Sequence, residues 1–294
     1  MTALVVVLFD SNVCEREMRS YPSSSGAVKL VRRVSGPVRE PVAPVATATA
    51  LSIVVPVFNP PARILEDSLA ALAQFRGRFA GAAELILVDD GSEPATAERL
   101  AVFAEREPHV TLIRNQENRG KGFATARGLL AGTGRYRVFT DVDLAYPVDQ
   151  IGRVCATLDE GYDLAVACRV HPESRYLMSP AFFRYLYSRH VMSRVFNAVV
   201  RMMLIPGMLD SQAGLKGMTA EAAQDLAPLL TVPGFAFDVE LLYAAYLRGY
   251  AIAQMPVSFR YDSEPTTVRF AQDAVHMFGD CARIRMNGAL GRYG

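Results

Sequence analysis

The chain has 294 residues, of which 51% are hydrophobic and 21% are charged. This balance is that of an ordinary globular protein with a sizeable core, in one large α/β domain with extensions or in two small domains. The formal net charge of +1 excludes a globally basic protein, so we expect no nucleic-acid partner.

The four cysteines, at positions 14, 155, 168 and 281, form no CxxC pair, and there are only four histidines. A zinc site and a disulfide framework are therefore not indicated, and a reducing, cytoplasmic location fits best. The apolar run from Ala3 to Phe9 is too short to span a membrane, and no other run reaches about 18 uncharged apolar residues. We expect a soluble or peripheral protein.

Strands and helices alternate along most of the chain. Residues 1–50 show no sustained periodicity and predict a largely disordered leader and linker outside the fold, with a short strand or helix within it as the alternative. The elements expected after it, in chain order, are strands over 51–57, 84–88, 110–114, 136–139 and 163–168, with helices over 61–75, 94–106, from 118–122 to about 132, and 148–158. This alternation predicts an α/β fold with a mostly parallel sheet and helices on both faces.

Three of these strands end in polar or acidic turns, after Val57, Val88 and Phe139. In parallel α/β sheets, ligands bind beyond the carboxyl ends of the strands, so the three turns should meet along one rim. After Phe139, the carboxylates of Asp141 and Asp143 stand one residue apart. Hard cations that carry phosphates take one or two carboxylates plus phosphate oxygens, so this pair predicts a seat for Mg²⁺ or Mn²⁺ holding a diphosphate. The alternative is a solvated Asp-x-Asp turn.

Two further segments have the chemistry of a nucleotide site. Asp89 and Asp90 precede Gly91, which permits a tight turn, and a carboxylate there can accept hydrogen bonds from a base or a ribose; the alternative is a capping turn for the next helix. Asn118–Gly122 opens a helix with two glycines and two cations, so its N–H groups and Lys121 can meet phosphate oxygens; the alternative is a basic helix start. The spacing is neither the P-loop nor the GxGxxG pattern, so ATP or dinucleotide binding is not supported.

Together these motifs resemble the nucleotide-binding half of an inverting family 2 glycosyltransferase with the GT-A fold. The residues that carry this resemblance are Val54–Asn59, Val88–Ser92, Asn118–Gly122 and Asp141–Asp143. It covers about residues 51–265 and leaves 266–294 as a C-terminal amphipathic helical extension. Within the family, the chain is similar to enzymes that put a hexose on a polyprenyl or dolichyl phosphate, through Asp141–Pro147, Arg169–Tyr176, Asp210–Lys216, Phe237–Glu240 and Pro256–Phe259. The Asp210–Lys216 stretch is closer to dolichyl-phosphate glucosyltransferases than to the mannose enzymes.

The resemblance implies a GT-A (Rossmann-like) fold, a metal-dependent hexosyltransferase and a set of site residues. The residues expected to bind the nucleotide-sugar donor are Pro56, Asn59, Asp89, Asp90, Lys121 and Asp141, and those expected to bind Mg²⁺ or Mn²⁺ are Asp141 and Asp143. The expected catalytic set is Asp143, Gln212 beside the donor sugar, Asp238 in the acceptor half, and Arg175. Phe58-Asn59-Pro60 departs from family versions with Glu after the Asn, which puts a carboxylate role there in doubt.

The expected reaction moves a hexose from UDP-glucose or GDP-mannose to a polyprenyl phosphate. A phosphate monoester is already anionic near neutral pH, so it needs little general-base help. The demands are leaving-group stabilisation and in-line positioning, and cations such as Arg169, Arg175 and Lys216 suit both. The alternatives are a family 2 enzyme with a soluble acceptor and a nucleotide-sugar-binding protein without transfer activity.

The stretch from Ser174 to Leu209 contains five arginines and no Asp or Glu. At helical spacing, one arc holds His190, Ser193, Arg194, Asn197 and Arg201, and the opposite arc holds Val191, Met192, Val195, Phe196, Val199, Met202 and Met203. This pattern predicts an interfacial anchor on the cytoplasmic face of a membrane; the alternative is a helix that packs on the sheet. The tail over 269–292, with four arginines among apolar residues, predicts a second such face. The oligomeric state is not predicted.

Overall fold

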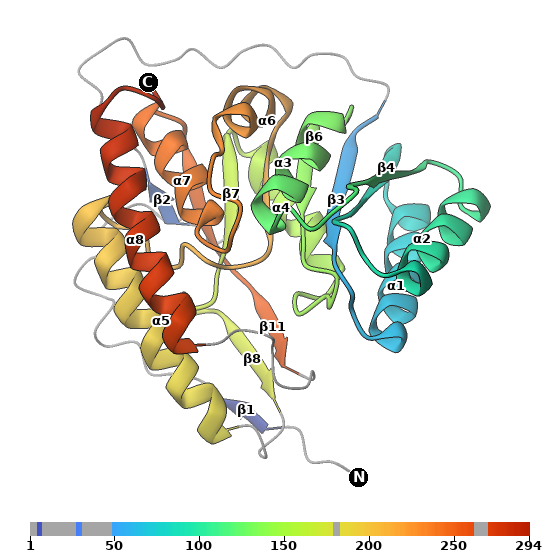
Figure 1. The fold of residues 1–294 in the computed structure, drawn as a ribbon, viewed down its shortest axis with the longest axis horizontal. Coiled ribbons are helices and arrows are strands. Elements are labelled where there is room, and N and C mark those ends of the chain that lie inside the picture. Colours follow the sequence, from blue (N-terminus) through green and yellow to red (C-terminus); the bar gives the residue numbers. More distant parts are fainter. Residues whose placement is uncertain (1–4, 8–27, 31–48, 179–182, 262–269) are drawn as a thin grey trace.

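The computed structural model describes residues 5–7, 28–30, 49–178, 183–261 and 270–294. Its main sheet has the strand order β2-β10-β7-β9-β6-β3-β4-β5 (Figure 1). The strands are β2 (Val28–Leu30), β3 (Leu51–Val57), β4 (Ala83–Asp89), β5 (Val110–Arg114), β6 (Tyr136–Phe139), β7 (Leu164–Cys168), β9 (Lys216–Thr219) and β10 (Ile252–Pro256). Neighbours are parallel except where β9 or β2 pairs. The predicted mostly parallel α/β sheet is confirmed.

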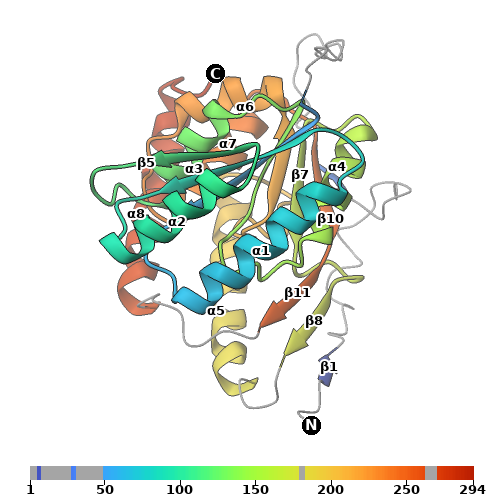
Figure 2. The ribbon, with the colours of Figure 1, turned by 90° about the vertical axis from the view of Figure 1, so that its right-hand side faces the viewer.

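Helices cover both faces of this sheet. They are α1 (Ala62–Arg78), α2 (Pro94–Arg106), α3 (Lys121–Ala131), α4 (Asp149–Asp159), α5 (Phe183–Met203), α6 (Ala220–Leu226), α7 (Phe237–Leu247) and α8 (Phe270–Ala289). Successive side chains of β3 enter two different cores, because a strand alternates its faces. Ile53 and Val55 pack with α1, α2 and α4, of which α1 and α2 come forward in Figure 2. Val54 packs with α3, α5, α6, α7 and α8.

A second sheet joins β1 (Val5–Val7), β8 (Arg175–Met178) and β11 (Ser258–Tyr261) in the order β1-β8-β11. The N–H of Arg260 on β11 donates to the carbonyl of Ala145 at 2.7 Å, so this sheet is tied to the loop that follows β6. Within the predicted leader, β1 pairs with β8 and β2 pairs with β10. The rest of residues 1–48 lies outside the described residues.

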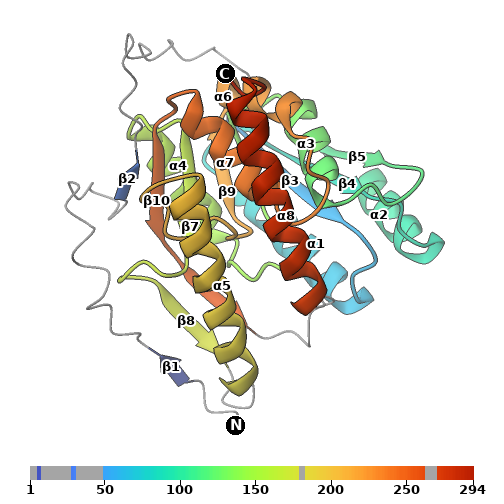
Figure 3. The ribbon, with the colours of Figure 1, turned by 60° about the vertical axis from the view of Figure 1, so that its left-hand side comes forward.

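Helix α5 packs on the sheet and also exposes apolar surface. Phe196 and Val200 are buried in the core, whereas Val195 and Met202 are 48% and 77% exposed. Asn197, which the sequence places on the polar arc, is also buried. One side of α5 therefore packs on the sheet, as one alternative predicts. The other side exposes apolar residues, as expected of an interfacial anchor. Figure 3 shows α5 and α8 side by side in front, and the rings of Phe196 and Phe278 meet edge-on at 6.0 Å.

Candidate active site

The carboxyl ends of β3, β4 and β6 lie at one edge of the main sheet. In the parallel register, Val57 at the end of β3 pairs with Asp89, and Val54 pairs with Phe139 at the end of β6. Pro56 is buried within β3. The three polar turns predicted to meet are therefore neighbours.

Asp89 and Asn59 hold the turn that opens α2. Asp89 is fully buried, and its Oδ1 accepts a hydrogen bond from the N–H of Ser92 at 2.9 Å. Arg114 Nε lies 3.2 Å from Asp89 Oδ2, a charge contact without hydrogen-bond alignment. Asn59 Oδ1 accepts from the N–H of Glu93 at 2.8 Å. Both side chains therefore stabilise this turn, and their contact with a nucleotide stays a prediction.

Asp90 shapes the basic loop before α3. It is 2% exposed, and its Oδ1 accepts from Asn115 Nδ2 at 2.6 Å and from the N–H of Arg119 at 3.0 Å. Its Oδ2 accepts from the N–H of Gly120 at 2.8 Å. Because both oxygens are engaged by this loop, Asp90 positions the segment that presents Lys121. The sequence interpretation did not single out Asn115, although a polar residue directly after β5 was a usable signal.

We expect Asp90→Ala to loosen this loop. The substitution leaves Asn115 Nδ2 and the N–H of Arg119 without this acceptor, and the N–H of Gly120 keeps only Asn118 Oδ1 at 3.1 Å. Such a loss costs about 1–3 kcal/mol of unfolding free energy. Urea unfolding measures that loss, and nucleotide binding by calorimetry should weaken in parallel. Asp67→Ala removes an exposed carboxylate on α1 and serves as the control. Unchanged nucleotide binding in a destabilised Asp90→Ala protein would contradict the positioning role.

Lys121 at the start of α3 contacts the carboxylate pair after β6. Its Nζ lies 2.5 Å from Asp141 Oδ1, and both side chains are partly exposed. Burial opposes the charge on Lys121, but Asp141 and Asp238, with a smaller contribution from Asp143, raise its pKa above the ordinary value. Asp143 is exposed on the same loop, and its Oδ1 accepts from the N–H of Ala145 at 3.1 Å. A charged lysine and two carboxylates thus stand together at the strand edge.

Gly214 keeps the space that Asp141 occupies. A Cβ built on Gly214 would overlap Oδ2 of Asp141, and the clash involves a carboxylate that is already paired with Lys121. The segment before β9 therefore approaches the carboxylate pair closely. Gly214 belongs to the Asp210–Lys216 motif. The sequence therefore marks this segment, but it does not show that Gly214 contacts Asp141.

The donor set fits a divalent cation with a diphosphate. Asp141 and Asp143 offer carboxylate oxygens from one loop, partly or fully exposed to solvent. Mg²⁺ in phosphate-transfer sites is held by one or two carboxylates together with phosphate oxygens, and Mn²⁺ accepts the same hard ligands. Lys121 adds a cation next to the pair. Asp141 and Asp143 are the residues that would hold the metal.

Two ion pairs with buried carboxylates lie behind this edge. Lys216 is fully buried, and its Nζ lies 2.5 Å from Asp238 Oδ1; burial lowers the pKa of Lys216 and raises that of Asp238. Arg169 grips Asp210 through Nε at 2.7 Å and Nη2 at 2.8 Å, a bidentate pair. Lys216 and Asp238 therefore satisfy each other, and their expected roles toward substrate stay predictions.

Gln212 and Arg175, the other expected catalytic residues, lie in different parts of the fold. The half-buried Gln212 follows Asp210, whose Oδ1 accepts from the N–H of Gln212 at 3.3 Å. Arg175 is exposed at the start of β8 in the second sheet. Gln212 thus shares a loop with the buried pairs, whereas Arg175 stands on the neighbouring sheet.

Tyr146 was not predicted as a site residue, although it lies in the Asp141–Pro147 motif. Its side chain is 2% exposed, and within the described residues its hydroxyl has no hydrogen-bond partner. Burial raises the pKa of Tyr146 well above its ordinary value, and Arg169 acts in the opposite direction. The phenol therefore stays neutral beside the charged pair of Arg169 and Asp210.

Comparison with known proteins adds independent matches. Residues 52–200 match the family model described as Glycosyl transferase family 2. The dolichyl-phosphate beta-glucosyltransferase of Dictyostelium discoideum is 29% identical over 249 residues, which cover 82% of this chain and 75% of that protein. The enzyme of the same name from Homo sapiens is 30% identical over 221 residues, covering 71% and 67%. Mycobacterium tuberculosis glucosyl-3-phosphoglycerate synthase, solved with Mn²⁺, UDP-glucose and phosphoglyceric acid, has a TM-score of 0.58 at 21% identity and covers 81% of this chain and 80% of that one. This last likeness concerns the fold.

Proposed function

The chain belongs to glycosyl transferase family 2, and on that basis we propose that it moves a hexose from a nucleotide sugar to a polyprenyl phosphate at the cytoplasmic face of a membrane. The observation that carries the proposal is the pair of Asp141 and Asp143 beside Lys121, at the edge where β3, β4 and β6 end. The names of the relatives from Dictyostelium discoideum and Homo sapiens support the lipid phosphate as acceptor.

The proposed chemistry is a single inverting displacement. An oxygen of the acceptor phosphate attacks the anomeric carbon of the hexose, the bond from that carbon to the diphosphate breaks, and a nucleoside diphosphate leaves. The attacking phosphate is already anionic, so no side chain has to remove a proton. Asp141 and Asp143 would hold Mg²⁺ or Mn²⁺, which would supply positive charge to the leaving diphosphate. Lys121 supplies a second positive charge, and Asp90 holds the loop before Lys121 through the N–H groups of Arg119 and Gly120.

Arg169 and Arg175 are the arginines we assign to the acceptor phosphate. Asp210 occupies two of the five N–H donors of Arg169 and fixes its plane, which leaves the remaining donors for an anion. The side chain of Arg169 is 22% exposed, so part of it reaches the surface. Arg175 is exposed at the start of β8, whose backbone pairs with β11.

Helices α5 and α8 form the surface we assign to the membrane. Beside Arg194 and Arg201, α5 exposes Val195 and Met202, and α8 exposes Met286 at 57%. Apolar side chains flanked by arginines suit a helix lying in the headgroup region. Within the described ranges, no helix combines the length and apolar character needed to cross a bilayer.

Reversing the two arginines of α5 should weaken membrane binding. The double variant Arg194→Glu/Arg201→Glu should bind anionic vesicles at least about tenfold more weakly, because each basic residue near the surface contributes about 1 kcal/mol. Flotation with phosphatidylglycerol-containing vesicles measures the binding. The matched control is Arg63→Glu/Arg78→Glu on α1, which makes the same change in net charge on the opposite face of the sheet. Equal binding of both double variants and the unmodified protein would return α5 to a purely structural role.

The proposed reaction is tested by radiolabelled hexose transfer with Mn²⁺. UDP-glucose and GDP-mannose are each offered with a polyprenyl phosphate in detergent, and label entering the organic phase establishes the reaction and identifies the donor. A parallel reaction offers a soluble phosphorylated acceptor. Label found only in the soluble product would replace the lipid acceptor, and nucleotide-sugar binding without any transfer would favour a binding protein.

A further inference from the structure

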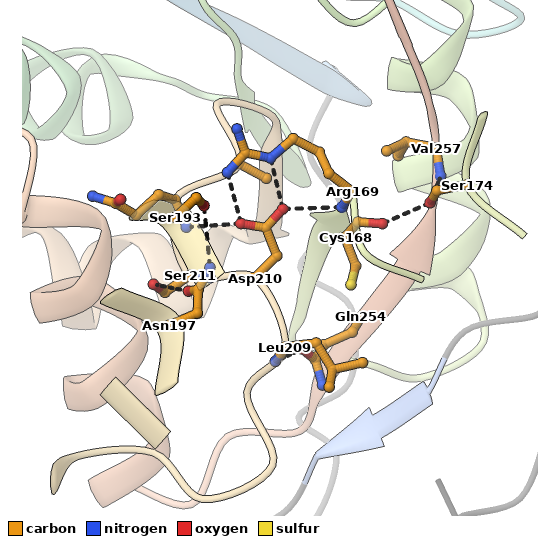
Figure 4. Close-up of polar contacts among 12 residues, drawn as sticks. Cys168, Arg169, Ser174, Ser193, Asn197, Leu209, Asp210, Ser211, Gln254 and Val257 are labelled. Carbon is orange, nitrogen blue, oxygen red and sulfur yellow. Dashed lines mark hydrogen bonds and ion pairs between the residues drawn. The ribbon is translucent and has the colours of Figure 1, made fainter. Parts of the chain in front are cut away.

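The loop over residues 209–214 precedes β9 and is anchored at four points along its length. The N–H of Leu209 donates to Gln254 Oε1 at 2.7 Å, and Asp210 is clamped by Arg169. Gly214 packs against the carboxylate of Asp141. The fourth anchor is Ser211, which bonds to a side chain of α5 (Figure 4). This loop therefore connects the carboxylate pair to the main sheet and to α5, which packs on it.

The anchor on α5 is Asn197. Its Oδ1 accepts two hydrogen bonds from Ser211, one from the N–H at 2.9 Å and one from the Oγ hydroxyl at 2.8 Å. Both residues are buried, with 3% of Asn197 and none of Ser211 exposed. Neither group of Ser211 reaches solvent, so loss of the amide oxygen would leave two buried donors without an acceptor. The catalytic set assigned above uses neither residue.

We propose that Asn197 is a positioning residue, which from α5 fixes the 209–214 loop and so sets where Gln212 and Asp141 stand against the donor. The inference rests on the proposed function for the role of Gln212. Ser211 directly precedes Gln212 in the chain, and only Ala213 separates Gln212 from Gly214, whose backbone limits the space around Asp141. A displacement of Ser211 would therefore shift both Gln212 and the backbone that packs against Asp141.

The test compares two substitutions of Asn197. In Asn197→Leu the acceptor is lost at similar volume, and we expect kcat for hexose transfer to fall about 10- to 100-fold, as small misplacements of reacting groups do, with the donor KM changed much less. In Asn197→Asp a carboxylate oxygen can accept both bonds from Ser211, so most of kcat should return. Rescue by the acceptor oxygen separates positioning from simple packing.

The matched control is Asn287→Leu. Asn287 is another buried asparagine, at the carboxyl end of α8, where its Nδ2 donates to the hydroxyl of Tyr293 at 3.2 Å. Its loss should destabilise the protein without lowering kcat at a temperature where all variants are folded. Equal losses of kcat in Asn197→Leu and Asn287→Leu would overturn the proposal.

Hydrogen exchange tests the same inference without the lipid acceptor substrate. The amides of Leu209 and Ser211 should exchange faster in Asn197→Leu, and Mn²⁺ should bind more weakly together with whichever of UDP or GDP the unmodified protein binds. Unchanged exchange in the 209–214 loop would overturn the positioning role. Neither hydrogen exchange nor Mn²⁺ and nucleotide binding requires the lipid. If the lipid acceptor is wrong, the unmodified protein will show no transfer, but both of these measurements will still test the role of Asn197.

Discussion

Asp141→Ala should reduce hexose transfer by about 1,000-fold or more, because it removes a ligand of the metal seat and with it several kcal/mol of charge stabilisation on the leaving diphosphate. The same change leaves Lys121 without the carboxylate 2.5 Å from its Nζ, so its ammonium loses its fixed place. Transfer is measured with radiolabelled donor, and Mn²⁺ binding by the loss of the free-ion signal in electron paramagnetic resonance. Both signals should fail together, since one carboxylate serves both.

The control for that variant is Asp149→Ala. Asp149 is an exposed acidic residue in the first turn of α4, close in sequence and identical in charge, but it is not part of the carboxylate pair. Its removal should change transfer less than about twofold, in line with surface substitutions generally. Near-normal turnover in Asp141→Ala would remove the metal assignment, whatever Asp149→Ala shows.

Lys216→Met should destabilise the fold by about 3–5 kcal/mol, because it leaves the carboxylate of Asp238 buried without its partner. Lys216 is fully buried, and its Nζ contacts both Asp238 Oδ1 and the carbonyl of Ala213 at 2.5 Å. Urea unfolding gives the free energy. The double variant Lys216→Met/Asp238→Leu removes both charges, and it should recover most of the loss in a double-mutant cycle.

The cost of Lys216→Met should also depend on pH. Burial raises the pKa of Asp238 in the folded protein above its ordinary value near 4. Lys216 opposes that rise, so in Lys216→Met the pKa of Asp238 is higher still. Between the unfolded and folded pKa the native state holds the extra proton, so the stability of the variant falls as pH rises through this wider window. The loss relative to the unmodified protein should therefore be smallest at acidic pH and grow toward neutrality. Arg248→Met, which breaks a more exposed pair with Asp225, is the control and should cost much less.

Much of the fold was accessible from the sequence because its signals are local. The β-branched run from Leu51 to Val57 predicts a strand, and the acidic turn after Phe139 marks the end of another. Parallel pairing then brings the ends of these strands together. The resemblance to family 2 glycosyltransferases, carried by those turns, is confirmed by the family match over residues 52–200.

The buried contacts behind the site were not accessible in this way. Lys216 and Asp238 are 22 positions apart in the chain, and Arg169 and Asp210 are 41 apart, so no periodicity links them. Helical spacing places Asn197 on the polar arc of α5 but cannot say that its amide is buried against Ser211. The sequence alone does not tell whether a polar side chain bonds to water or to a distant loop.

Helix α5 faces the outside with Val195 and Met202 and the interior with Asn197. One rigid rod thus touches both the proposed bilayer and the loop that carries Gln212. If α5 tilts when its exposed side binds lipid, the 209–214 loop moves with it. The rate of hexose transfer would then depend on the thickness and charge of the bilayer. Detergent assays would then report a different turnover from assays in lipid nanodiscs, with the same sequence and the same substrates.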